Sequence, residues 1–181
     1  MTQLSVFLSE TPAAPIEVTT DFSTIADKIA SLGARLEKWQ ANTPIAPHAD
    51  HAAILSAYAE DIERIKQHGG YTTADVVRLN PDHPDKEALR AKFLDEHTHS
   101  EDEVRFFVEG SGAFYINAGQ HIFQLICEQG DLLSVPANTP HWFDMGPRPN
   151  FTAIRIFTNP AGWVGNFTGS GLSAQYPRYG D

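Results

Sequence analysis

Cysteine is nearly absent from this chain of 181 residues, which contains only Cys127. A single cysteine cannot form an intrachain disulfide, and it excludes a zinc module built from several thiolates. No run of residues approaches the ~20 apolar positions that a membrane-spanning helix needs. The first residues, MTQLSVFLSETPAAP, lack the basic start and the long apolar run of a signal peptide. These absences favour a cytoplasmic protein that does not associate with a membrane.

Basic residues are also scarce, with 13 Lys and Arg against 23 Asp and Glu and a net charge of −10. A chain with this charge repels nucleic acid and anionic membrane surfaces, so neither is an expected partner. Hydrophobic residues make up 41% of the chain, which is typical of a globular protein and excludes disorder throughout. The length suits one domain with a substantial core.

The first half of the chain, up to Leu94, combines helix and strand patterns. Helices are predicted over residues 22–32, 51–68 and 86–94, because apolar residues recur at helical spacing in each. Glycines follow the first two of these segments and are expected to end them. Short strands are predicted over residues 34–39 and 75–79.

From residue 95 onward, short apolar runs alternate with turn residues at the close spacing of antiparallel strands in a sandwich or barrel. The runs are EVRFFVEG, GAFYINA, HIFQLICE, DLLSVPA, HWFDM and FTAIRIF, with a hairpin turn expected at residues 118–120. We expect one domain over residues 1–181, composed of a mixed part (1–94), a barrel core (95–158) and a tail (159–181) that wraps the barrel. No long unpaired apolar strip stands out, which favours a monomer.

The segment EHTHSEDEVRFFVEG, residues 96–110, carries the clearest functional signal. His97 and His99 are two residues apart, so on a strand their imidazoles point to the same face. Glu103 has the same parity and can join them, and His141 comes from a distant strand in GDLLSVPANTPHWF. Three imidazoles and one carboxylate predict a site for a borderline divalent ion, namely Fe, Mn, Ni, Co, Cu or Zn. In octahedral geometry, two positions stay open for a chelating substrate or water.

Arg105 shares the strand parity of Glu103 and is expected to face the same interior. There its guanidinium would add positive charge and bind an enolate or carboxylate, although pairing with Asp102 or Glu103 is the simpler alternative. Glu96, Glu101 and Asp102 form an acidic run, which is typical of a solvated face. One of these three acids could accept a proton at the mouth of the site.

These motifs resemble those of the cupins. The segment from His97 to Gly110 matches the first cupin motif in full. The segment from Gly130 to His141 matches most of the second, with Asn138 where glycine is usual. The resemblance implies a mainly β fold, a double-stranded β-helix (jelly-roll) barrel with the N-terminal helices packed outside.

A narrower resemblance covers nearly the whole chain. KEALRAKFLDEHTHSEDEVRFFVEGSGAF, GDLLSVPANTPHWFDMG and NFTAIRIFTNPAGWVGNFTG look like segments of bacterial acireductone dioxygenases. This implies a methionine-salvage enzyme that cleaves the small molecule 1,2-dihydroxy-3-keto-5-methylthiopentene with O2, using one Fe(II) or Ni(II) ion per chain. The resemblance further implies 2-keto-4-methylthiobutyrate and formate from the Fe(II) form, and methylthiopropionate, formate and CO from the Ni(II) form.

The resemblance also implies roles for individual residues. The three histidines and the glutamate would bind the metal, and Arg105 would stabilise the substrate anion. Phe93 and Trp163 would line the substrate pocket, and Phe107 is expected beside them as a further apolar residue near the site. Asp102 would handle a proton or orient Arg105.

Two other functions fit the same ligand set. One is a different cupin metalloenzyme of the oxalate or quercetin type, and the other is a non-enzymatic binding cupin that contains a metal. The apolar residues near the site favour a substrate with an apolar tail over bare oxalate. A structural metal site is usually closed and tetrahedral, so an interior arginine beside it argues against the non-enzymatic function.

Overall fold

The structure is a computed structural model that describes residues 1–159 and 164–181. Its helices are α1 (Phe22–Ser31), α2 (His51–Ala57), α3 (Ala59–Gly69) and α4 (Lys86–Leu94), followed late in the chain by the 3-10 turn η2 (Leu172–Gln175). Its strands are β1 (Gln3–Leu8), β2 (Glu17–Thr19), β3 (Arg35–Lys38), β4 (Thr73–Leu79), β5 (His97–Thr98), β6 (Glu103–Asn117), β7 (His121–Glu128), β8 (Asp131–Val135), β9 (His141–Asp144), β10 (Asn150–Phe157) and β11 (Asn166–Phe167).

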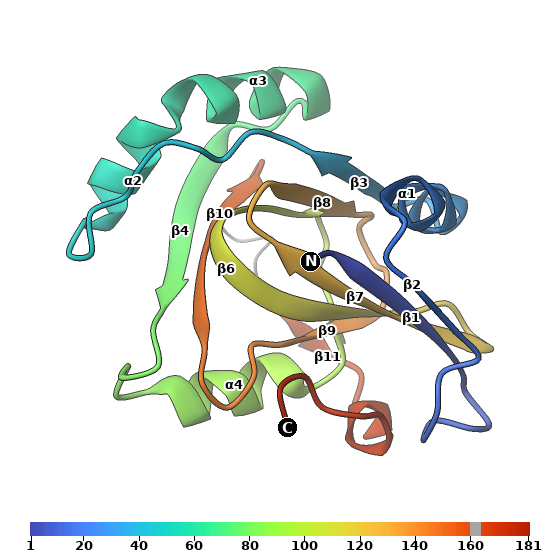
Figure 1. Ribbon diagram of the computed structural model, residues 1–181. Helices are drawn as coiled ribbons and strands as arrows, with labels where there is room; N and C mark the ends of the chain where they lie inside the picture. The colour runs from blue at the N-terminus through green and yellow to red at the C-terminus, as the bar shows by residue number, and fades with distance from the viewer. Residues whose placement is uncertain (160–163) are drawn as a thin grey trace.

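The long strand β6 organises the barrel (Figure 1). Its first half pairs with β8 and β10, and its second half pairs with β7 and β9, always antiparallel. One layer therefore runs β4-β10-β6-β8-β3, and the other runs β11-β5-β9-β6-β7-β1-β2. Because β6 belongs to both layers, the sheet curves around a common interior. This arrangement confirms the prediction of a mainly β barrel.

β6 is a single strand, whereas the sequence runs EVRFFVEG and GAFYINA predicted two. Gly110 lies at the boundary between those runs and has a φ of 66°. A Cβ atom at this position would lie 1.8 Å from the carbonyl oxygen of Asn150, so only glycine fits here without a shift. The register with β10 also shifts between Thr152 and Ala153. Gly110 thus permits a bend within a continuous strand.

The alternation of β6 separates an interior core from an outer one. Phe107 packs into the interior cluster, whereas Val104 and Phe106 belong to a second cluster on the outer face. Helices α2 and α3 cover that outer face, lying against β4 and β10 in Figure 1. The helices therefore pack outside the barrel, as predicted. Their buried contributions to the outer cluster are Ile54, Tyr58, Ile62 and Ile65.

The helix predicted over residues 51–68 is two helices, interrupted at Tyr58. This residue has a φ of −114° and is fully buried. Its hydroxyl donates to the carbonyl oxygen of Thr43 at 3.0 Å, and its ring meets that of Phe106 edge to face at 5.7 Å. These tertiary contacts fix the position of the Tyr58 side chain, and the backbone at this residue departs from helical geometry. The other predicted helices correspond to α1 and α4, and the predicted short strands correspond to β3 and β4.

The two ends of the chain pack together on the outside of the second layer. β1 was not predicted, because its four central residues are buried and it therefore lacks the polar–apolar alternation of a half-exposed strand. In the tail, Tyr176 packs against Phe7 of β1 and Trp142 of β9, with ring centroids 5.6 and 5.8 Å away. The segment around Tyr176 thus packs against the barrel wall. Within the described part of the chain, no helix combines the length and apolar character needed to cross a membrane.

Candidate metal centre

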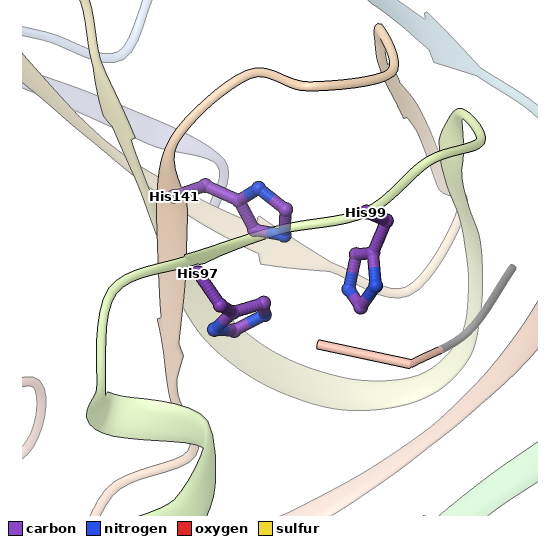
Figure 2. A group of neighbouring side chains, drawn as sticks. All are labelled: His97, His99 and His141. Carbon is purple, nitrogen blue, oxygen red and sulfur yellow. The ribbon is translucent and has the colours of Figure 1, made fainter. Parts of the chain in front are cut away.

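Strands β5 and β9 bring three histidines together. His97 pairs directly with His141 in the antiparallel register, and His99 follows two residues after His97. Figure 2 shows the three imidazoles clustered, two from the β5 segment and one from β9. One nitrogen of each ring lies within 4.8 Å of the others, and all three residues are buried. Convergence of buried nitrogen donors at this spacing is suited to a metal ion.

Backbone carbonyls select the tautomer of each ring. Nδ1 of His97 lies 2.6 Å from the carbonyl oxygen of Asp95, and Nδ1 of His141 lies 2.8 Å from that of Thr139. His99 has a corresponding carbonyl partner at 3.3 Å. Because a carbonyl oxygen only accepts, each Nδ1 must carry the proton and each Nε2 keeps its lone pair for a ligand.

Glu103 begins β6 beside the histidines and is 2% exposed. One carboxylate oxygen, Oε1, accepts a hydrogen bond from Arg105, and the other, Oε2, lies 3.3 Å from Nε2 of His99. Among the described residues, neither Oε2 of Glu103 nor Nε2 of His141 has a hydrogen-bond partner. A buried polar atom without a partner costs ~1–3 kcal/mol. Both atoms carry a lone pair without a hydrogen-bond partner, which fits a divalent cation that both would bind.

The protonation states also suit a metal. Burial lowers the pKa of His99, and burial lowers the pKa of His141 to about 4, so both imidazoles are neutral at pH 7. Burial alone would raise the pKa of Glu103, but the charge of Arg105, together with that of the adjacent imidazoles when they protonate in acid, holds it below its ordinary value. Metal binding requires neutral imidazole and ionised carboxylate, which are the forms present here.

A cavity of about 500 Å³ opens in front of these four residues. Lys92, Arg105 and Arg155 supply positive charge to its wall. The apolar part of the wall is mainly aromatic, from Phe93, Phe114, Phe143 and Phe167, and Val164 also contributes. A cavity lined by both cationic and aromatic side chains suits a small anion that carries an apolar tail.

The predicted pocket residues lie in different places. Arg105 and Phe93 line the cavity. Phe107 is fully buried and lines a much smaller adjoining cavity of about 10 Å³, which shares Phe93 and Arg105 with the main one. Trp163 lies outside the described residues.

The acidic run is not a solvated face, contrary to the prediction. Glu96 is 7% exposed, and Glu101 and Asp102 are half-buried. Asp102 accepts hydrogen bonds from the Tyr71 hydroxyl at 2.8 Å and from the Ala137 amide at 3.0 Å. The structure therefore places Asp102 away from the cavity wall, where it ties down the loop that leads to the third histidine.

Arg155 was missed by the sequence-based prediction. It lies on β10 directly opposite Arg105 of β6 and pairs with Asp75 of β4 through a 2.6 Å contact from Nε to Oδ1. Its signal was a single charged residue within the apolar run FTAIRIF. A charged residue in an apolar run can be interpreted only when the strand register is known, and here the register places Arg155 opposite Arg105.

Known proteins resemble this chain over most of its length. Residues 9–165 match the family described as ARD/ARD′. The chain belongs to this family. Its curated relatives include acireductone dioxygenase 1 of Pectobacterium atrosepticum, 59% identical over 93% of this chain and 97% of the relative. The acireductone dioxygenase of Pseudomonas aeruginosa is 50% identical over 98% of each chain.

A solved structure of an ARD/ARD′ relative shares the fold. The acireductone dioxygenase from Bacillus anthracis, with a cadmium ion in its active centre, superimposes with a TM-score of 0.80 at 30% identity. The match covers 92% of this chain and 98% of the other. The present chain therefore has the cupin fold and is a dioxygenase of the acireductone dioxygenase kind.

Proposed function

We propose that this enzyme cleaves 1,2-dihydroxy-3-keto-5-methylthiopentene with O2 in methionine salvage. One Fe(II) or Ni(II) ion would be held by His97, His99, Glu103 and His141. The observation that carries the proposal is the pair of buried, unsatisfied donor atoms on Glu103 and His141 beside a cavity of about 500 Å³. When bound, the ion supplies Lewis acidity and a template for the substrate oxygens.

The cavity wall supports the proposed binding of this substrate. The guanidinium of Arg105 and the neighbouring charges of Arg155 and Lys92 attract the oxygen atoms of an enediolate. Phe93 and Phe143, whose ring centroids lie 6.4 Å apart, offer an apolar surface to the methylthio tail. The residues of the wall thus orient the substrate and exclude water from its reacting end.

The choice of metal would decide the products. Imidazole and carboxylate donors accept both iron and nickel, so the ligand set does not select one of them. We propose that the Fe(II) form gives 2-keto-4-methylthiobutyrate and formate, and that the Ni(II) form gives methylthiopropionate, formate and CO. We also propose that the enzyme is a monomer, because no long unpaired apolar strip stands out in the sequence, and sedimentation would test this.

The experiment is O2 uptake with synthetic acireductone, using metal-free protein reloaded separately with Fe(II) and with Ni(II). We expect turnover with each ion and a different product set for each. Identical products would contradict the proposed role of the metal. Stoichiometric metal binding without turnover of acireductone would contradict the proposed function. Turnover of oxalate or of a flavonol instead would assign the site to another type of cupin enzyme.

A further inference from the structure

Glu96 is a buried carboxylate that the proposed reaction does not use. It lies immediately before the predicted ligand His97 and is 7% exposed. Oε2 accepts from Nδ2 of Asn117 at 2.8 Å, and Oε1 accepts from the hydroxyls of Thr168 at 2.7 Å and Ser170 at 2.9 Å. Its backbone oxygen also accepts from the Thr168 amide at 3.0 Å. Glu96 therefore joins the start of β5 to the chain just after β11.

The stretch that Glu96 holds, residues 164–170, forms one wall of the metal centre. Phe167 of β11 pairs with His97, and their rings lie 6.0 Å apart. The carbonyl oxygen of Val164 is the 3.3 Å partner of Nδ1 of His99. Val164, Gly165 and Phe167 all line the main cavity. The position of this stretch therefore affects two histidines and the cavity wall together.

Apolar burial contributes little to holding this stretch. Val164 is 65% exposed and Phe167 is 55% exposed. β11 is only two residues long and pairs with an equally short strand, β5. A short edge strand with exposed side chains opens readily unless polar contacts restrain it. The partly buried hydrogen bonds of Glu96 are contacts of that kind.

We propose that Glu96 is a positioning residue that sets metal retention and substrate binding through residues 164–170. It holds the Val164 carbonyl against His99 and keeps Phe167 over His97. The effect on substrate rests on the proposed function, whereas the effects on the stretch and on metal binding do not depend on turnover.

The first variant is Glu96→Gln, which keeps the size of the side chain and replaces one acceptor oxygen by an amide donor. It cannot accept from Asn117 and from both hydroxyls at once. We expect faster hydrogen–deuterium exchange at the backbone amides of residues 166–170. We also expect about 10-fold weaker Ni(II) binding to the full chain by calorimetry, since partners outside the ligand shell contribute at this level. KM for acireductone should rise by a larger factor than kcat falls.

A rescue variant distinguishes positioning from a general loss of structure. Glu96→Gln combined with Asn117→Asp exchanges amide and carboxylate across the same hydrogen bond and leaves net charge unchanged. The oxygen of the new amide can then accept from Thr168 and Ser170, and we expect exchange rates and metal affinity to return toward wild type. The control Glu60→Gln, on the exposed face of α3, should change none of these quantities.

A second route avoids changing the buried acid. Thr168→Val with Ser170→Ala removes the hydroxyl donors and leaves Glu96 bonded to Asn117. It should reproduce the faster exchange and weaker Ni(II) binding even if Glu96→Gln does not fold. Wild-type exchange and affinity in this variant would overturn the proposal, as would faster exchange with unchanged affinity and KM. A wild-type enzyme that does not turn over acireductone would contradict the proposed function alone, because exchange and calorimetry would still decide the role of Glu96.

Discussion

Removal of the Arg105 guanidinium tests the electrostatics of the metal centre. Arg105 donates to the Glu103 carboxylate, and their side chains are only 11% and 2% exposed. The variant Arg105→Ala leaves this carboxylate buried without that partner. Breaking a buried ion pair from one side costs about 3–5 kcal/mol, because the remaining charge keeps its desolvation cost. We expect a loss of this size in the unfolding free energy of the metal-free protein at pH 7.

A bound ion should reduce that loss. A dication held by the histidines restores a positive charge beside Glu103, so the metal-loaded variant should be destabilised less than the metal-free one. Urea unfolding of both forms measures the difference. Arg148→Ala is the control, because Arg148 is exposed and a surface change of this kind stays within about 0.5 kcal/mol.

The pH dependence follows from the direction of the pKa shift. Burial opposes ionisation of Glu103, but Arg105 and the imidazoles hold its pKa below the ordinary value of 4.5. A lowered pKa stabilises the fold above that ordinary value, and this contribution is lost as pH falls through the folded-state pKa. In Arg105→Ala the pKa should rise, so the loss should begin at higher pH. Equal unfolding free energies for the metal-free variant and wild type at pH 7 would refute this reasoning.

Three further predictions address the ligands, the strand bend and the surface charges. His97→Ala should lose stoichiometric Ni(II) after dialysis, measured by elemental analysis; a fully loaded variant would show that the ligand set is wrong. Gly110→Ala should destabilise the protein in urea by more than the ~1–2 kcal/mol of a left-handed conformation, because its Cβ would meet Asn150. Gly119→Ala, with a φ of 74° and open space around it, should cost only that conformational part. Burial alone would raise the pKa of Glu128, but its pairs with the N-terminal ammonium and Lys38 lower it to about 2. Its contribution to stability should therefore be present above pH 4.5 and fade toward pH 2, and Glu128→Gln should flatten this part of the melting temperature profile.

Local periodicity was enough to predict which of the closely spaced side chains face the same interior. His97 and His99 share a face because strand side chains alternate, and Glu103 and Arg105 reach the same interior by the same rule. Parity also explains why Phe107 points inward. It did not show how far Phe107 lies behind the cavity wall, because depth depends on packing against other strands.

Features that depend on distant partners were missed or misread. Gly110 looked like a break because its role depends on the Asn150 backbone, 40 residues away in the chain. Tyr58 interrupts a helix because its side chain meets Phe106, and Arg155 reaches the cavity because β10 registers against β6. None of these contacts leaves a periodic trace in the sequence.

The sequence by itself predicted the three histidines that the structure brings together, the barrel class and the resemblance to a family, since each rests on residue types and short spacings. Only the tertiary structure decided which donor atoms are buried without partners and how the acidic run is used. Glu96 illustrates the difference. In the sequence it belongs to an acidic run, which is typical of a solvated face, whereas in the structure Asn117, Thr168 and Ser170 donate hydrogen bonds to it. Burial and hydrogen bonding are properties of the folded neighbourhood, and residues 21 to 74 positions apart create that neighbourhood.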